Sequence, residues 1–178
     1  MTMEQGGFTD SKGRALHTYS WVVPGEGEVT GLVFLCHGYA ERLIPYYTQL
    51  AEEGRKRGLL CFGHDHVGHG QSEGERVQVG DMAEYVDPVI THCKAMTDKY
   101  PNTPLFIVGH SMGGLITLLT ILKTQVKQYL WGLSGPSEGF LIPSCLETEH
   151  IRYSLLKQLL GHLSKISSPL KIEDNSKN

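Results

Sequence analysis

Residues 105–114, LFIVGHSMGG, decide the fold of this chain. Residues 105–108 form a short apolar run between a proline and a glycine, which is typical of a strand buried on both faces. Residues 115–122 are apolar nearly all round, which predicts a largely buried helix. The sequence therefore predicts a strand, a very tight turn at Ser111 and a helix, in immediate succession.

Ser111 is the centre of a G-x-S-x-G pattern whose glycines are Gly109 and Gly113. Between a strand and a helix this spacing is typical of a nucleophile elbow, where a strained backbone exposes the serine hydroxyl. The next amide, on Met112, lies at the helix N-terminus and can stabilise a carbonyl oxygen that becomes negative during acyl transfer. The alternative is a glycine-rich turn with a solvated serine. We favour the elbow, with Ser111 as the nucleophile.

A second predicted strand also ends in a glycine-containing turn. Residues 32–36 are continuously apolar and lead directly into His37-Gly38-Tyr39-Ala40. Acyl transfer at an elbow uses a second amide from the loop after a neighbouring strand, and Tyr39 is the candidate donor. The alternative is an ordinary strand-to-helix turn. Together with the elbow, the pattern favours an oxyanion hole formed by the backbone N–H groups of Tyr39 and Met112.

A histidine-rich loop follows the strand expected at residues 59–63. The sequence of residues 64–74, HDHVGHGQSEG, allows two interpretations. The H-x-H-x-x-H spacing of His64, His66 and His69 is similar to a zinc-ligand motif, but Gly68 stands where that motif has an aspartate. The other interpretation is a tight loop shaped by glycines and by Asp and Ser side chains that bond the backbone. We favour the structural interpretation and expect no metal and no cofactor.

The composition limits the classes of function. With 178 residues, 40% hydrophobic and 20% charged, the chain is expected to form one domain. Its formal charge of −3 predicts no basic surface, so nucleic acid is not an expected partner. No apolar leader or membrane-length run is present, and the cysteines, at 36, 61, 93 and 145, form no C-x-x-C pair. We therefore expect a cytoplasmic protein with reduced cysteines.

The remaining pattern alternates strands and helices. A strand over residues 16–23 is expected as an edge or entry strand of the sheet, and a helix over 45–58 with Tyr46, Leu50 and Gly54 on one side. Another helix runs to residue 100 from a capping box at Asp81 and Glu84, and Pro88 is expected to kink or restart it. This order predicts an α/β fold, a mostly parallel sheet with helices on both faces and the serine at a strand's carboxyl end.

The motifs also carry a specific resemblance. HDHVGHGQSEGER at 64–76 and GHSMGG at 109–114 resemble the monoglyceride lipase family, in the serine-aminopeptidase-like branch of the α/β-hydrolase superfamily. The resemblance covers about residues 10–120. It implies Ser111 as nucleophile, the Tyr39 and Met112 amides as oxyanion hole, and a monoacylglycerol or similar fatty-acyl ester as substrate. Tyr39 is larger than the residue expected there, so its ring is expected to narrow or reshape the entrance.

After about residue 120 the family pattern is lost. Such hydrolases place a triad aspartate and histidine after later strands, with a lid between them. Here no further pair of strands and no lid is recognised, so we expect a fold incomplete at its C-terminus, with residues 1–143 as the hydrolase core. Residues 131–143 read as a loop, and residues 144–178 as a divergent amphipathic helix, at 147–166, and a polar tail. The candidate carboxylates and bases are Glu138, Glu147, Glu149, Glu173, Asp174, His150 and His162.

Three functions follow from this pattern. The first is a serine esterase that acts through an acyl-serine intermediate and in which a histidine of the tail reaches Ser111. The second is a catalytically inactive, C-terminally truncated or divergent form that binds lipid or a protein partner. The third is a metal-dependent hydrolase that uses the histidine-rich loop. We favour the first by family, with a fatty-acyl ester as partner and a peripheral membrane contact as a further expectation.

Overall fold

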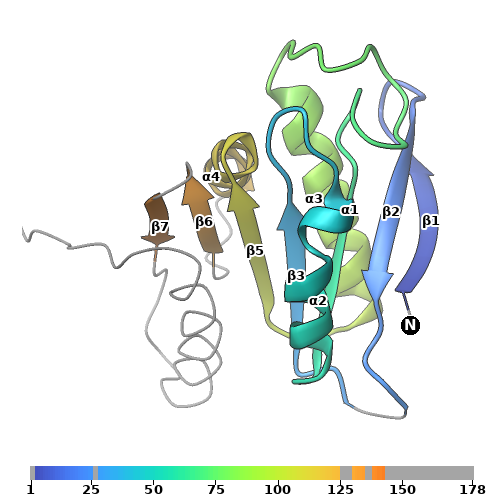
Figure 1. Cartoon of the computed structure of the whole chain (residues 1–178), viewed down its shortest axis with the longest axis vertical. Helices are drawn as coiled ribbons and strands as arrows, with labels where there is room; N and C mark the ends of the chain where they lie inside the picture. Colours follow the sequence, from blue (N-terminus) through green and yellow to red (C-terminus); the bar gives the residue numbers. More distant parts are fainter. Residues whose placement is uncertain (1–2, 26–27, 125–129, 135–137, 143–178) are drawn as a thin grey trace, which may run out of the picture.

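The computed structural model describes residues 3–25, 28–124, 130–134 and 138–142, and for the last two segments only the backbone is considered. These residues form a seven-stranded sheet with the order β1-β2-β4-β3-β5-β6-β7 (Figure 1). The strands are β1 Met3–Thr9, β2 Ala15–Trp21, β3 Gly31–Cys36, β4 Leu59–His64, β5 Leu105–His110, β6 Leu130–Ser134 and β7 Glu138–Ile142. The helices are α1 Leu43–Tyr46, α2 Thr48–Arg55, α3 Ala83–Lys99 and α4 Met112–Thr124.

The centre of the sheet is parallel. Strand β3 pairs in parallel with β4 and with β5, and β5 pairs in parallel with β6. Phe34 of β3 therefore lies between Phe62 of β4 and Ile107 of β5. The outer strands are antiparallel to their neighbours, with β1 beside β2, β2 beside β4, and β7 beside β6. The expected α/β fold is confirmed, and among the described strands the sheet is mixed, with a parallel centre and antiparallel outer pairs.

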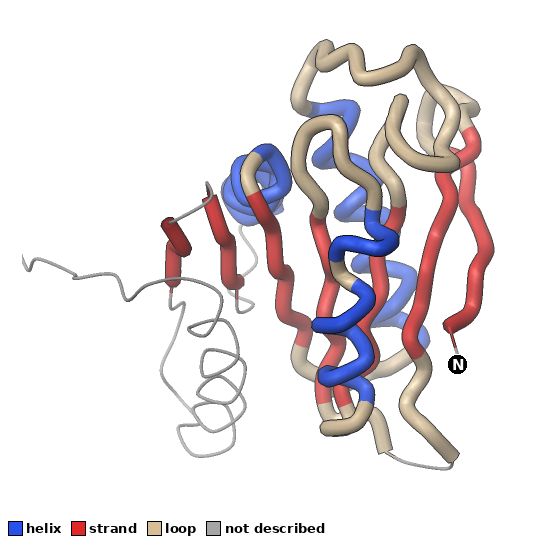
Figure 2. Tube along the Cα trace, viewed as in Figure 1, coloured by secondary structure: helices blue, strands red, loops and turns tan. Residues whose placement is uncertain are grey.

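Helices cover both faces of the sheet, with α2 in front and α3 behind it (Figures 1 and 2). One core cluster joins alternate residues of β3, including Phe34, to Val89 of α3 and Ile116 of α4. The other cluster joins the intervening β3 residues, including Leu35, to Ala51 of α2. The central strands are thus buried on both faces, as the apolar runs predicted.

The N-terminal strand was not predicted. Residues 3–9, MEQGGFT, lack an apolar alternation, yet their backbone pairs with β2 along its whole length, from Met3 opposite Trp21 to Thr9 opposite Ala15. The expectation that residues 16–23 form an edge strand was therefore wrong, because β2 lies between β1 and β4. An outer strand needs few buried side chains, so its sequence carries a weak signal.

The helix expected over 45–58 is divided. Ile44 has extended backbone angles, and the segment forms the short α1 followed by α2. The expected inward face was wrong at Tyr46, which is 53% exposed, whereas Tyr47 is buried and donates its hydroxyl hydrogen bond to the carbonyl of Cys36 at 3.0 Å. Leu50 and Gly54 do face the core, so the error is confined to the break before α2, which a continuous 3.6-residue pattern cannot anticipate.

Helix α3 is one element that continues through Pro88, so the expected restart at this residue does not occur. The expected capping box does not form, because α3 has Met82 as its N-cap and no side-chain cap hydrogen bond. The Asp81 carboxylate accepts the N–H of Ala83 at 2.9 Å, but the Glu84 carboxylate forms ion pairs with Lys12 and Arg14 instead. These ion pairs fasten the β1–β2 turn to the start of α3.

Strands β6 and β7 correct the expectation that residues 131–143 form a loop and that no strand pair follows the serine. The helix predicted over 147–166 and the polar tail lie outside the described residues. Within the part of the chain that the structure describes, no helix is both long enough and apolar enough to cross a membrane.

Candidate active site

The strand-to-helix turn at Ser111 is as tight as the sequence predicted. Strand β5 ends at His110 and α4 begins at Met112, so Ser111 alone makes the turn. Its φ is 53°, in the left-handed region that a residue with a Cβ rarely adopts. The N–H of Gly114 donates to the Ser111 carbonyl at 2.9 Å, which holds this conformation. The side chain is exposed at the carboxyl end of a central strand.

The two glycines of the G-x-S-x-G pattern are required by close backbone contacts. A Cβ on Gly109 would lie 2.6 Å from Thr117 Oγ1 and would also overlap the carbonyl of Gly113. A Cβ on Gly113 would lie 2.6 Å from the carbonyl oxygen of His37 and would overlap that of Cys36. The first turn of α4 therefore packs directly on the end of β3, which brings the two sequence motifs together.

The loop after β3, residues 37–41, contains the expected second amide. Among the described residues, the N–H groups of Tyr39 and Met112 donate no hydrogen bond. The loop lies against the turn at Ser111, because a Cβ on Gly38 would be 3.2 Å from the His110 carbonyl oxygen. Two backbone N–H groups without a partner among the described residues thus lie within two residues of this contact, one on Tyr39 and one on Met112, the first residue of α4.

The His37 ring fixes this loop from inside the protein. Its Nδ1–H donates to the Gly38 carbonyl at 2.9 Å, and its Nε2 accepts the backbone N–H of His66 at 2.9 Å. The ring is fully buried, and burial lowers its pKa to about 4. Since Nε2 accepts a hydrogen bond, this network requires the neutral ring with its proton on Nδ1.

The histidine-rich loop is shaped as the structural interpretation predicted. Asp65 is completely buried, and its carboxylate accepts bonds from the backbone N–H groups of Leu43 and Gln71 and from the Tyr19 hydroxyl, each at 2.9 Å. The Ser72 hydroxyl donates to the Asp65 carbonyl at 2.5 Å. Positive φ values of 71°, 48° and 118° occur at the loop glycines, Gly68, Gly70 and Gly74.

The three histidines considered as metal ligands point to different partners. His64 Nδ1 faces His92 Nδ1 at 3.2 Å, His66 Nε2 donates to the His37 carbonyl at 3.1 Å, and His69 Nδ1 donates to the Val67 carbonyl at 2.8 Å. No group of three or more potential ligands is placed to hold a metal ion within the described segments. Burial lowers the pKa of His64 and of His66 well below the ordinary value, so these rings are neutral parts of the core.

Glu41 was not singled out from the sequence, yet it lies between the two loops. Its carboxylate accepts the backbone N–H of Gly38 at 2.8 Å, and its other oxygen lies 3.6 Å from His110 Nε2. The His110 ring stacks on Tyr46 at a centroid distance of 5.3 Å. In the sequence Glu41 is one charged residue among many. Its position three residues after Gly38 is the one feature from which a hydrogen bond to the backbone of the preceding turn could have been predicted.

The Tyr39 side chain crosses to the histidine-rich loop. Its hydroxyl donates to the Val77 carbonyl at 3.2 Å, and its ring faces the His69 ring edge-on at 6.2 Å. The ring remains 53% exposed. The tyrosine side chain therefore connects the loop after β3 to the segment after β4, and its effect on the entrance to the site stays a prediction.

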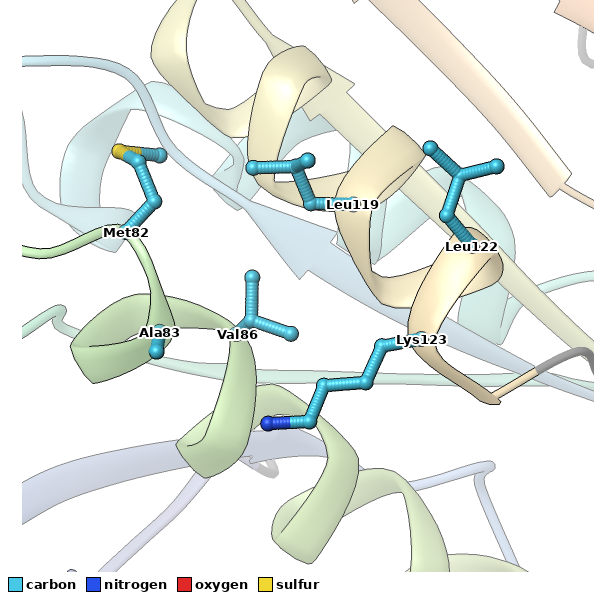
Figure 3. A pocket seen from close by; sticks show the side chains of 6 residues that line it. All are labelled: Met82, Ala83, Val86, Leu119, Leu122 and Lys123. Carbon is cyan, nitrogen blue, oxygen red and sulfur yellow. The ribbon is translucent and has the colours of Figure 1, made fainter.

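A separate apolar groove of about 410 Å³ lies between α3 and α4 (Figure 3). Its lining consists of Met82, Ala83, Val86, Leu119, Leu122 and Lys123. Ser111 is not part of this lining, so the groove is distinct from the turn between β5 and α4.

The remaining triad candidates lie beyond what the structure describes. Glu138 falls in β7, for which only the backbone is considered, and the other tail candidates, Glu147, Glu149, His150, His162, Glu173 and Asp174, lie in residues 143–178. Within the described residues, no histidine is hydrogen-bonded to the Ser111 hydroxyl. The structure thus places the turn that carries Ser111 and Met112 against the loop that carries Tyr39, and among the described residues no general base is found beside Ser111.

Several known proteins of similar sequence are named as lipases. The chain is 47% identical over 94 residues to human monoglyceride lipase, a match that covers 53% of this chain and 31% of the human protein. It is 36% identical over 107 residues to monoacylglycerol lipase of Mycolicibacterium smegmatis, covering 60% of this chain and 38% of that protein. The matches thus span about a third of these curated relatives.

Solved structures share the fold. A thermostable carboxyl esterase from Bacillus coagulans, solved in complex with glycerol, superposes with a TM-score of 0.65 over 93% of this chain and 51% of that chain, at 19% identity. A serine hydrolase without a lid from Xanthomonas campestris superposes with a TM-score of 0.63 over 82% of this chain and 66% of that chain, at 15% identity. Both show the α/β-hydrolase fold.

The family model for serine aminopeptidase S33 matches residues 27–173, which includes both loops of the site and runs past residue 120, where the motif resemblance ends. The strand order and the sharp turn at Ser111 are the features expected of the family that this match identifies. The chain belongs to the serine aminopeptidase S33 family of α/β-hydrolases.

Proposed function

We propose that this chain is a serine carboxylic-ester hydrolase in which Ser111 is the nucleophile and the N–H groups of Tyr39 and Met112 form the oxyanion hole. One observation carries the proposal. An exposed serine at φ 53° stands between two loops in backbone contact, each of which has an N–H group with no partner among the described residues. Strain at a single exposed serine is typical of a functional turn.

The proposed reaction is acyl transfer. The Ser111 oxygen attacks the ester carbonyl carbon, a general base accepts the hydroxyl proton, and the carbonyl oxygen becomes an oxyanion that receives hydrogen bonds from Tyr39 and Met112. Collapse of this intermediate releases the alcohol, which takes up the proton, and leaves an acyl-serine. Water then attacks the acyl-serine and releases the carboxylic acid. The candidate bases are His150 and His162, since the rings of the histidine-rich loop are buried and none of them is hydrogen-bonded to Ser111.

The proposed substrate is a monoacylglycerol or a similar fatty-acyl ester. Support comes from the names of the relatives, which include monoglyceride lipases at 43% to 47% identity over about half of this chain. We also propose a peripheral contact with lipid, because Leu115 and Leu122 of α4 are 47% and 74% exposed. Such a contact would bring a fatty-acyl ester to the loops around Ser111.

The test is covalent labelling of the purified chain with a fluorophosphonate probe, which reports an activated serine, followed by mass spectrometry of the labelled peptide. The expected result is labelling at Ser111 that is lost in Ser111→Ala. His150→Gln and His162→Gln identify the base, because only one of them should prevent labelling. Hydrolysis of a monoacylglycerol series, measured as fatty acid released, then tests the substrate class.

Two controls separate the other candidate functions. A chelator such as EDTA should leave labelling and hydrolysis unchanged, and loss of hydrolysis with EDTA but not with Ser111→Ala would indicate a metal-dependent enzyme. Folded protein that does not label at all would contradict the proposal. The search would then turn to ligand binding without turnover, measured as an increase in melting temperature when a fatty-acyl ester is added.

A further inference from the structure

Both peptide groups that flank Gly38 form hydrogen bonds with His37 or Glu41. The peptide before Gly38 presents its N–H to the Glu41 carboxylate at 2.8 Å. The peptide after Gly38 presents its carbonyl to His37 Nδ1–H at 2.9 Å and to the Glu41 N–H at 3.4 Å. Glu41 therefore contacts the loop twice, once through its side chain and once through its backbone.

The orientation of the second peptide determines where the Tyr39 N–H points. The Gly38 carbonyl and the Tyr39 N–H belong to one planar trans peptide, so they point in opposite directions. Gly38 itself imposes little restraint, because a residue without a Cβ adopts many backbone conformations at similar energy. The hydrogen bonds made by its neighbours must therefore supply the restraint.

Glu41 also joins this loop to the turn that carries the serine. Its second carboxylate oxygen lies 3.6 Å from Nε2 of His110, the residue before Ser111. The Glu41 side chain is 28% exposed and that of His110 is 19% exposed, so the contact is partly shielded from water. The sharp turn from Gly38 to Glu41 includes Ala40 at a φ of 57°, and it brings the carboxylate back over Gly38.

We infer that Glu41 is a positioning residue, whose hydrogen bond to the Gly38 N–H holds the Tyr39 amide toward the substrate oxygen at Ser111. This inference rests on the proposed function, since it concerns the same reaction. The role of Glu41 is to accept a hydrogen bond, and a neutral amide oxygen can do the same. Glu41→Gln should therefore preserve the role, and Glu41→Ala should abolish it.

The first test measures the second-order rate constant of fluorophosphonate labelling at Ser111. Glu41→Ala is expected to slow labelling about 10- to 100-fold, because a misplacement of about 1 Å in a reacting group can cost roughly 100-fold. Glu41→Gln is expected to stay within about threefold of the parent chain. Glu53→Ala is the matched control, since Glu53 pairs only with Lys56 and Arg57 on the surface of α2, and it should label at the parent rate.

The second test does not depend on catalysis. Backbone NMR measures the hydrogen exchange of the Gly38 amide, which should be slow in the parent chain and in Glu41→Gln and faster in Glu41→Ala. Labelling of Glu41→Ala at the parent rate, equal losses in the Ala and Gln variants, or equal exchange in the parent and Glu41→Ala would each overturn the inference. A parent chain that does not label but shows the expected exchange would contradict the proposed function alone and support the positioning of Gly38.

Discussion

The backbone N–H of His66 donates to Nε2 of His37 at 2.9 Å, so the loops after β4 and β3 are joined by a bond that exists only while the His37 ring is neutral. The rings themselves lie 4.1 Å apart between centroids. His66 Nε2 returns a hydrogen bond to the His37 carbonyl at 3.1 Å. The loop after β3, residues 37–41, is thus held by the histidine-rich loop, although His37 and His66 are about 30 residues apart in sequence.

Acid is therefore expected to destabilise the fold. Burial lowers the pKa of both His37 and His92 to about 4, while the unfolded chain titrates near 6.5. Between these values the unfolded state binds more protons, so the free energy of unfolding should fall as the pH is lowered, by about 1.4 kcal/mol per pH unit for each such histidine. Denaturant unfolding at pH 7, 6 and 5 measures this slope. His92→Phe should reduce this slope by about 1.4 kcal/mol per pH unit, which corresponds to one proton. An unchanged slope would contradict the lowered pKa of His92.

The left-handed conformation of Ser111 should cost stability. A residue with a Cβ at a φ of 53° is strained, whereas glycine adopts this conformation readily. Ser111→Gly is therefore expected to raise the free energy of unfolding by about 1 kcal/mol while removing the proposed nucleophile. Ser111→Ala is the control, because it removes the hydroxyl but keeps the Cβ and the strain. Equal stability of the Gly and Ala variants would argue against strain at this turn.

The close contact between α4 and the end of β3 should tolerate no side chain at Gly113. A Cβ there would overlap the carbonyl of Cys36 and lie 2.6 Å from that of His37, and neither backbone group can move freely. Gly113→Ala is expected to lower the free energy of unfolding by more than about 2 kcal/mol. Gly80→Ala is the matched control, since a Cβ at Gly80 meets nothing within 4 Å. Similar melting temperatures for the two variants would contradict the packing described above.

The carboxylate of Asp65 should be a main support of the histidine-rich loop. It is completely buried and accepts three hydrogen bonds, so truncation leaves several polar groups without partners. Asp65→Ala is expected to lower the free energy of unfolding by about 3 kcal/mol or more. The comparison is Asp98→Ala, which removes an exposed pair with Lys94 and should cost within about 0.5 kcal/mol. Chemical denaturation of both variants distinguishes these outcomes.

The local pattern of the sequence determined the centre of this fold. Apolar runs bounded by glycine and proline placed β3, β4 and β5 closely, because strands buried on both faces need apolar residues throughout. The G-x-S-x-G spacing placed the turn at Ser111; the demand for glycine is local at Gly109, which lies against Gly113 and Thr117, whereas at Gly113 it comes from the end of β3. The glycines and Asp65 of the histidine-rich loop also followed from local turn chemistry.

Only the tertiary structure decided the rest. Strand β1 is held by backbone pairing with β2, which leaves almost no trace in side-chain pattern. The register of α1 and α2 depends on where Tyr47 meets the Cys36 carbonyl, a contact between separate elements. Glu41 contacts both the Gly38 N–H and the His110 ring because the chain turns back on itself between Gly38 and Glu41. Such contacts join residues that sequence alone leaves unrelated, because their energies depend on the packed arrangement rather than on local conformation.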